Sequence, residues 1–225
     1  MSLVIVTTVD DVPVPTINDI SSFEVEVVDL ELWVDYIFLD ADERRRFAQV
    51  SHEYLISQVQ SHNYPIGPDI NQFQLRFNHP CKELMWFIHQ PDFGQDLFAV
   101  ADTPEDTIYY AKLILNNSDR EKQRESTYYR CVIPYSHHEG GYSQGLTVDT
   151  DGINEHQGGF YLYSFAIKPD EHQPSGTCNF SRIDNAVLLI KLNPSVSLLS
   201  TAYIYATNYN VLRIMSGMGG LAYSN

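Results

Sequence analysis

Short strand-like stretches separated by turn-forming residues are the feature that most constrains the fold of this chain. The stretches alternate apolar with polar residues or are rich in β-branched and aromatic side chains, which favours strands over helices. They cover residues 52–60, 72–77, 83–89, 107–115, 127–133, 160–167, 186–192 and 201–212. Clusters of Asn, Asp, Gly and Pro lie between them. The pattern predicts an all-β chain, a jelly-roll β-sandwich of two antiparallel sheets with about eight strands and short helical turns in the loops.

The N-terminal part of the chain has a different character. Residues 1–23 include two prolines, and Asn, Asp and Ser are frequent toward their end, which predicts an extended arm or linker. Residues 24–225 show no further boundary, so we expect them to form a single domain. Within that domain, residues 29–38 carry an apolar side chain at every even position. This period of two predicts a strand with one buried face.

A short helix is expected directly after this strand. Asp40 is a candidate N-cap, and Glu43 follows three residues later as in a capping box. The same turn carries Arg44, Arg45 and Arg46. We interpret the three arginines as a solvated helical face that pairs with nearby acids, because the surrounding charge is negative.

The distribution of charge argues against several classes of partner. The formal net charge is −15, and residues 1–43 hold eleven acidic residues and no Lys or Arg. The remainder balances eighteen acids against fourteen bases, so no basic face is available to meet phosphate. Direct binding to nucleic acid or to an anionic membrane is therefore disfavoured. No apolar stretch approaches the roughly 20 residues of a membrane span, so membrane insertion is not expected.

The N-terminal sequence also bears on the cellular compartment. It lacks the basic segment and the long apolar core of a signal peptide, so an intracellular origin is expected. Two N-glycosylation sequons begin at Asn116 and Asn179, and we interpret them as chance matches for this reason. Whether either asparagine carries a glycan stays open at this point.

The cysteines predict little chemistry. Cys81, Cys131 and Cys178 are odd in number and have no short spacing, which argues against a disulfide framework and a zinc site. Cys178 has no base near it in the sequence, so a packed, unreactive thiol is expected there.

The densest group of potential metal ligands is His137, His138 and Glu139. Adjacent side chains on a strand point to opposite faces, so at most two of the three could share an ion. The His-x-His spacing of metal-dependent cupins is absent. We therefore interpret the group as carrying no metal.

Other motifs also fall short of a catalytic proposal. Asp149 and Asp151 lack the further oxygen ligands of a calcium loop. The glycine-rich residues 216–220 lack the lysine of a phosphate loop and are expected to let the chain turn sharply. Ser175 and Ser181 have no nucleophile-elbow setting. No catalytic, cofactor-binding or metal site is predicted, and we do not expect an enzyme.

Three longer segments resemble one protein family closely. Residues 34–49 read VDYIFLDADERRRFAQ, residues 163–185 read YSFAIKPDEHQPSGTCNFSRIDN, and residues 208–225 read NYNVLRIMSGMGGLAYSN. A weaker fourth segment covers residues 77–84. All four are similar to the major capsid protein of nucleocytoplasmic large DNA viruses, in the expected order over nearly all of residues 30–225.

The resemblance implies structural work without a cofactor. The family fold is two jelly rolls in tandem, and these motifs belong to the second, so the chain resembles half of the usual protein. The resemblance implies homotrimeric, pseudo-hexagonal capsomers that tile an icosahedral shell and contact neighbouring capsomers and minor capsid proteins. The implied location is the virion, after synthesis in the host cytoplasm. An acidic protein suits this role because an internal membrane separates the shell from the genome.

Residues 169–185 form the most unusual of these motifs. Charged residues surround a Pro-Ser-Gly turn, and Arg182 lies near its end. Our hypothesis is a rigid loop held by internal salt bridges and hydrogen bonds, at the base of the subunit or at a subunit contact. The alternative is a surface turn with incidental charges.

Two other functions compete with the shell. A jelly-roll module that binds carbohydrate would use exposed loop aromatics such as Tyr64 or Tyr142. A cupin-like enzyme would require a metal.

Overall fold

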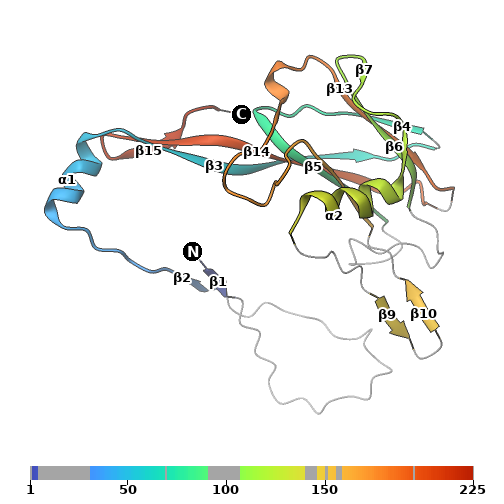
Figure 1. The fold of residues 1–225 in the computed structure, drawn as a ribbon, viewed down its shortest axis with the longest axis horizontal. Coiled ribbons are helices and arrows are strands. Elements are labelled where there is room, and N and C mark those ends of the chain that lie inside the picture. Colours follow the sequence, from blue (N-terminus) through green and yellow to red (C-terminus); the bar gives the residue numbers. More distant parts are fainter. Residues whose placement is uncertain are drawn as a thin grey trace, which may run out of the picture.

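Two antiparallel sheets form a sandwich, and the ends of the longest strands of the larger sheet project from it as a ribbon (Figure 1). The computed structural model describes residues 2–4, 31–68, 70–90, 107–139, 146–149, 152–155, 159–194 and 196–224. Within them most residues of regular structure lie in strands. The prediction of an all-β sandwich of two antiparallel sheets is confirmed.

The larger sheet is arranged around one long strand. Its members are β3 (His52–Pro65), β5 (Pro80–His89), β11 (Phe160–Ser164), β12 (Cys178–Asn179), β14 (Thr201–Met215) and β15 (Met218–Leu221). One edge of β14 pairs with β3 over almost its full length. The other edge pairs first with β5, as far as Asn208, and then with β15 from Leu212 onward. β14 therefore belongs to the sandwich at its start and to the ribbon at its end.

The smaller sheet covers one face of the larger one. It contains β4 (Ile70–Gln74), β6 (Ile108–Leu115), β7 (Ser118–Asp119), β8 (Arg124–Glu125) and β13 (Ala186–Leu192). β13 lies between β4 and β6 and buries every second side chain, as period-two alternation predicts. Two further hairpins stand apart: β1 (Ser2–Val4) with β2 (Glu31–Trp33), and β9 (Leu146–Asp149) with β10 (Gly152–Glu155).

Apolar and aromatic side chains from both sheets fill the space between them. Trp86 of β5, Ile204 of β14 and Leu188 of β13 are each almost fully buried. The Trp86 ring lies 5.3 Å from that of Tyr129 in an edge-to-face arrangement, which adds a directional contact to the burial of area.

Two hairpin turns follow directly from local sequence. Asn116 and Asn117 join β6 to β7, and Ser216 and Gly217 join β14 to β15. All four residues have positive φ angles, as a two-residue type I′ turn requires. The expected sharp turn within residues 216–220 is thus confirmed as a hairpin.

Residues 127–133 are not the strand that their aromatic and β-branched content predicts. Tyr128–Val132 form a π-helical turn that continues into α2 (Ile133–His137). Tyr129, Ile133 and Pro134 are buried, a spacing that places them on one helical face. Pro134 has no N–H for a sheet ladder but is tolerated in the first turn of a helix. Burial of this face prevails over the weak intrinsic preference for strand.

The predicted strand at residues 29–38 is also largely wrong. Of its described residues, 31–38, only Glu31–Trp33 lie in a strand, β2, and the residues from there to the next helix have no regular structure. The expected buried face is absent among the described residues of this stretch, because Tyr36, Ile37 and Phe38 are 80%, 85% and 93% exposed. Most of the predicted arm at residues 1–23 lies outside the described residues, and the single domain over residues 24–225 stays a prediction.

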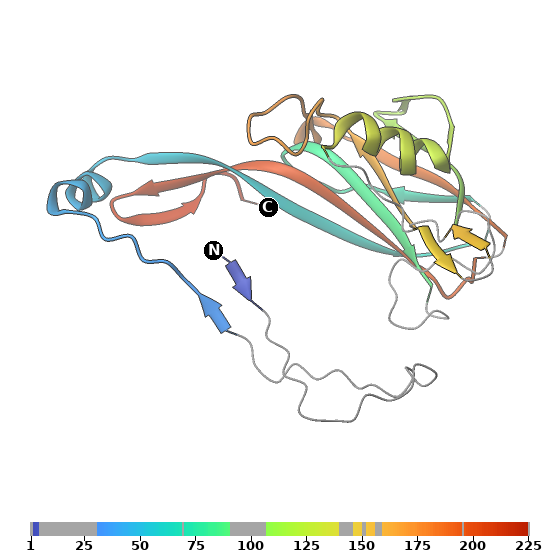
Figure 2. The same ribbon diagram turned by 60° about the horizontal axis from the view of Figure 1, so that its bottom comes forward.

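The helix expected after this stretch is present at the far end of the ribbon (Figure 2). It is α1 (Ala41–Gln49), and the Asp40 carboxylate accepts hydrogen bonds from the backbone N–H groups of Asp42 and Glu43 at 3.1 and 3.0 Å. Arg45 pairs with Asp42 at 3.2 Å, and no residue of α1 is buried. The N-cap and the solvated basic face are therefore confirmed. Of the helices in the described ranges, none is long and apolar enough to cross a membrane.

The helical segment at residues 128–137 yields a first prediction. The buried Tyr129 hydroxyl lies 3.1 Å from the Ala111 carbonyl oxygen and 2.7 Å from the Glu121 carboxylate. Tyr129→Phe leaves these acceptors without their donor, so the free energy of unfolding should fall by about 1–2 kcal/mol. Urea denaturation measures the change. The control is Tyr135→Phe at a side chain that is 89% exposed, where the change should stay within about 0.5 kcal/mol. Equal losses of unfolding free energy in the two variants would contradict the burial of the Tyr129 hydroxyl in this segment.

Candidate functional site

Two features of the surface are candidates for function. The first is the loop of residues 165–177 together with the groups that hold it, which we call the clasp. The second is the exposed stretch of residues 32–38, which we call the apolar arm. The clasp contains the first part of the sequence-predicted motif, residues 169–177, whereas exposure of the apolar arm was not predicted.

Both ends of the clasp loop are fixed on the same strand. β11 enters the loop with Ser164 opposite Glu83, and β12 leaves it with Cys178 opposite Cys81. Between these two pairs the register of β5 against β14 shifts by one residue, leaving Lys82 as the extra residue of a β-bulge. The Lys82 carbonyl accepts hydrogen bonds from the first two backbone N–H groups of the loop, at 2.9 and 3.1 Å.

Polar contacts inside the loop close it on itself. The Ser175 hydroxyl accepts a hydrogen bond from the Lys168 backbone N–H at 2.9 Å and donates one to the Lys168 carbonyl at 3.1 Å. Gly176 has a φ of +146°, and a Cβ there would lie 2.7 Å from the Phe165 carbonyl oxygen. The buried Lys82 ammonium donates to the Pro169 carbonyl at 2.7 Å. Ser175 thus serves the loop, and only glycine fits the position after it.

His138, at the C-terminal end of α2, joins the loop to the sheet. Its Nδ1 lies 2.8 Å from a carboxylate oxygen of Asp170 in the loop. Its Nε2 lies 3.2 Å from the Glu83 carboxylate of β5, an ion-pair contact outside hydrogen-bond geometry. The His138 side chain is only 7% exposed. Glu83 raises the pKa of His138, burial opposes the rise, and Asp170 adds to it, so the imidazolium is favoured.

The residues on either side of His138 also contact groups of the loop. His137 Nδ1 lies 3.0 Å from the Ile167 carbonyl oxygen, and Glu139 lies 3.5 Å from the Lys168 ammonium, which also pairs with Glu171 at 2.7 Å. The three consecutive residues 137–139 therefore all hold the loop, and His138 and Glu139 share Asp170 because the Glu139 backbone N–H also donates to its carboxylate at 3.1 Å. Among the described residues, no group of three or more His, Cys, Asp or Glu side chains is arranged to hold a metal ion.

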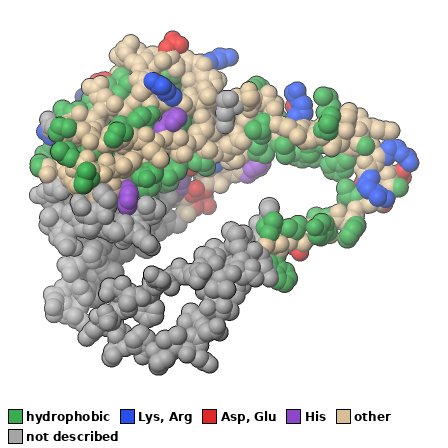
Figure 3. Space-filling view, turned by 180° about the vertical axis from the view of Figure 1, so that it is seen from behind, with side chains coloured by type: hydrophobic (Ala, Val, Ile, Leu, Met, Phe, Trp, Pro, Cys, Tyr) green, Lys and Arg blue, Asp and Glu red, His purple; other side chains and the backbone are tan. Residues whose placement is uncertain are grey.

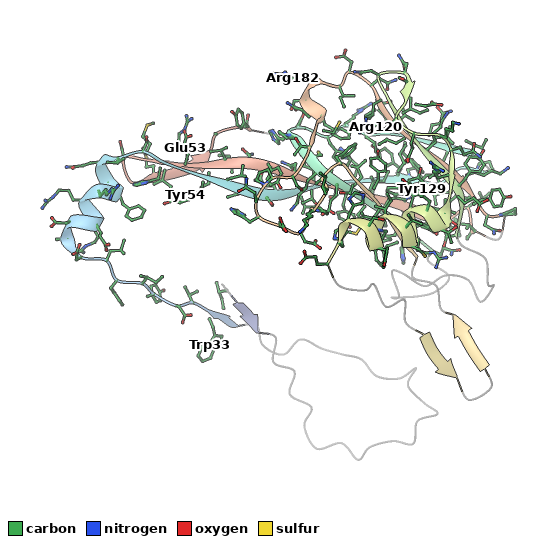
Figure 4. The ribbon with its side chains drawn as sticks, viewed as in Figure 1. Trp33, Glu53, Tyr54, Arg120, Tyr129 and Arg182 are labelled. Atoms are coloured by element: carbon green, nitrogen blue, oxygen red, sulfur yellow. The ribbon has the colours of Figure 1, made fainter. Side chains whose placement is uncertain are left out.

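The hypothesis of a loop held by internal contacts is confirmed for these pairs, but Arg182 takes no part in them. Its side chain is exposed and makes no ion pair within the described residues (Figure 4). The segment around it is held by amides instead. The Asn116 side-chain oxygen accepts from the backbone N–H groups of Asp184 and Asn185, and the Asn117 side-chain oxygen accepts from the Asn185 amide. Both asparagines belong to the β6–β7 turn. The C-terminal part of the motif, around Arg182, is therefore anchored to the smaller sheet.

Other sequence candidates have structural partners or lie outside the described residues. The Ser181 hydroxyl accepts from the His79 backbone N–H at 2.8 Å. The half-buried Tyr64 donates its hydroxyl to the Gln74 carbonyl, so it offers no free platform for a sugar. Asp151 and Tyr142 lie outside the described residues, and Asp149 is described only as the last residue of β9.

The apolar arm is the largest concentration of exposed apolar side chains. It contains Leu32, Trp33, Val34, Tyr36, Ile37 and Phe38. Figure 3 shows apolar side chains continuing along the ribbon, where Val59 and Met218 are 64% and 74% exposed. Exposed apolar patches of this kind mark interaction surfaces. The period-two pattern of residues 29–38 already indicated an apolar face. Such a pattern does not tell whether the surface that covers this face belongs to the same domain or to a partner.

The comparisons with known proteins point in one direction. Residues 43–220 match the family described as large eukaryotic DNA virus major capsid protein. The chain is 50% identical over 203 residues to the major capsid protein of Pyramimonas orientalis virus, covering 86% of this chain and 48% of that protein. It is 39% identical over 257 residues to the major capsid protein of Paramecium bursaria Chlorella virus 1, covering 87% and 54%.

A solved structure agrees with these sequence matches. The chain is similar to a protein in the quasi-atomic structure of the PBCV-1 virus capsid, with a TM-score of 0.69 and 36% identity over 92% of this chain and 61% of that one. The similarity supports the jelly-roll assignment of the sandwich. The chain spans about half the length of the curated relatives that it matches.

The His138 contacts yield a prediction about pH. Because the folded-state pKa of His138 is raised, its contribution to stability is complete below the unfolded value of about 6.5 and is lost as pH rises through the folded value. His138→Gln should therefore cost most near pH 6, about 1–3 kcal/mol, or about 2–4 °C in melting temperature per kcal/mol. The gap to the unmodified protein should narrow toward pH 9. Melting curves across this range measure it.

The matched control for this prediction is His172→Gln, at an exposed histidine of the same loop. It should leave the pH profile of the melting temperature unchanged. A deficit of His138→Gln that stays constant from pH 6 to pH 9 would contradict the ionic role of the imidazole.

Proposed function

Because this chain belongs to the major capsid protein family of large eukaryotic DNA viruses, we propose that it is a structural subunit of an icosahedral viral shell and not an enzyme. The observation that carries the proposal is the 50% identity to a viral major capsid protein over most of the chain. The contacts of His137, His138 and Ser175 support it, since each of these reactive side chains has a partner in the clasp. The work of such a protein is to present rigid surfaces to its neighbours.

The chain corresponds, in this proposal, to the second of two jelly rolls. Its matched relatives are about twice as long, and the described residues contain one sandwich. Residues 24–225 would form this second domain, and residues 1–23 would be the arm or linker before it. The apolar arm would then lie at the junction between the two domains or between two subunits.

The proposed assembly is a homotrimeric, pseudo-hexagonal capsomer that tiles the shell with its neighbours and with minor capsid proteins. Sandwiches standing side by side need lateral contacts, and the ribbon and apolar arm supply apolar area for them. Burying such area stabilises a contact by roughly 25 cal/mol per Å². The net charge of −15 suits a shell that touches no nucleic acid directly. The proposed location is the virion, after synthesis in the host cytoplasm.

Self-association of the 225-residue chain tests this proposal. Size-exclusion chromatography with light scattering, over a series of concentrations, should show a trimer in equilibrium with the monomer. The double variant Ile37→Asp with Phe38→Asp places charges in the apolar arm and should weaken association at least about tenfold. The control Leu199→Asp changes a side chain that is 78% exposed on the sandwich and should leave the equilibrium unchanged.

One result would contradict the proposed assembly, and a second would contradict the role of the apolar arm in it. One is a monomer at every concentration, which would exclude a homotrimer of this chain. The other is an unchanged trimer in the apolar-arm variant, which would place the contact elsewhere. Hexagonal arrays in electron micrographs of the unmodified protein would support the shell role directly.

A further inference from the structure

Two of the three cysteines face each other across neighbouring strands. Cys81 of β5 and Cys178 of β12 are directly opposite in the antiparallel register. Cys81 is fully buried, and the half-buried Cys178 packs against the same core. We propose that this pair is a redox modification site, where a disulfide forms reversibly when the protein meets a disulfide-bearing oxidant such as oxidised glutathione. The proposal stands independently of the role in a shell.

The strand pairing brings the two residues within reach of a bond. The Phe180 N–H donates to the His79 carbonyl at 3.0 Å, two positions along the same ladder, so the cysteines occupy a hydrogen-bonded pair with Cα atoms about 5.5 Å apart. Disulfides span Cα separations of roughly 4.4–6.8 Å. Directly opposed side chains also point to the same face of the sheet. The Cα separation and the side-chain direction therefore both meet the requirement.

A small movement of β12 toward β5 brings the Cβ atoms of the two cysteines to the separation found in disulfides. Cβ atoms of an opposed pair lie about 4.5–5.5 Å apart, at or above the 3.5–4.5 Å range found in disulfides. β12 contains only two residues and follows the clasp loop at the edge of the sheet. It can move toward β5 without disturbing a longer ladder.

The two thiols differ in reactivity. Burial, with a smaller contribution from Cys178, raises the pKa of Cys81 to about 12. Burial also raises the pKa of Cys178, but the Arg120 guanidinium partly offsets this rise by favouring the thiolate. Cys178, being also the more exposed, is the group that meets the oxidant first.

The exchange proceeds in two balanced steps. The Cys178 thiolate attacks one sulfur of glutathione disulfide, forms a mixed disulfide and releases one glutathione thiolate. The Cys81 sulfur then attacks Cys178 Sγ and displaces the second glutathione, whose leaving thiolate takes up the Cys81 proton. Two protein thiols are oxidised to one disulfide, and one glutathione disulfide is reduced to two thiols. Dithiothreitol reverses the sequence.

The Cys81–Cys178 disulfide would constrain the clasp loop. Cys178 is the residue at which the loop returns to β5, so a disulfide fixes that end of the loop covalently. It also closes a loop of roughly 100 residues, which restricts the unfolded chain and raises the melting temperature. Cys131 lies on the π-helical turn at Tyr128–Val132 and is the matched control.

The experiment uses the purified 225-residue protein incubated under native conditions with oxidised glutathione. Alkylation of the remaining thiols and non-reducing peptide mass spectrometry should find Cys81 linked to Cys178 and only Cys131 alkylated. The melting temperature should rise by about 5 °C and return after dithiothreitol. Cys131→Ser should behave in the same way, whereas Cys178→Ser should form no internal disulfide.

Three outcomes would overturn the proposal, and each is readable in the unmodified protein alone. They are three alkylated cysteines after oxidation, a persistent glutathione adduct on Cys178, and a linkage that involves Cys131. The oligomeric state is measured in the same samples, so a failure of this inference is distinct from a failure of the proposed assembly.

Discussion

The pairing of β14 on both of its edges is the constraint on which the rest of the structure depends. β3 follows one edge throughout, while β5 and then β15 share the other. At the exchange point, buried amides take over from apolar side chains. Asn208 accepts from Gln60 at 3.0 Å, and Asn210 donates to Gln58 and to the Tyr223 carbonyl, each at 2.9 Å. Because these two amides are satisfied, the strand continues out of the core without leaving either buried side chain unpaired, and the ribbon becomes an extension of the sheet.

The clasp depends on the same sheet through β5. The β-bulge at Lys82 lets Cys81 and Leu84 both face the core although they are three residues apart, which strict alternation forbids. Lys82 and Glu83 can therefore contact the loop and α2, while Cys81 and Leu84 pack in the core. The loop is fixed at both ends on one strand and tied to α2 through His138, so its conformation is constrained from two sides. Rigid loops of this kind suit a protein whose proposed work is contact with its neighbours.

The stable core and the proposed contact surface lie in different parts of the molecule. The core between the two sheets is apolar, aromatic and almost free of exposed area. The apolar arm and the end of the ribbon show the opposite, with large apolar side chains facing solvent (Figure 3). Such surface contributes nothing to the stability of the isolated chain and becomes favourable only when a partner covers it. Membership of the capsid family supplies a reason for such a surface, because shells are built from covered contacts.

The sequence by itself determined the elements whose signals are local. Alternation placed most strands of the sandwich, turn-forming Asn and Gly residues placed the turns after β6 and β14, and Asp40 placed the start of α1. The family motifs determined the kind of protein. Only the tertiary structure decided the helical state of residues 128–137, the exposure of the apolar arm and the partners of His138 and Cys81. These features depend on groups distant in sequence, such as Glu83 with His138 and Cys81 with Cys178. A periodic pattern reports which side of an element is apolar, but only the packed chain decides what that side meets.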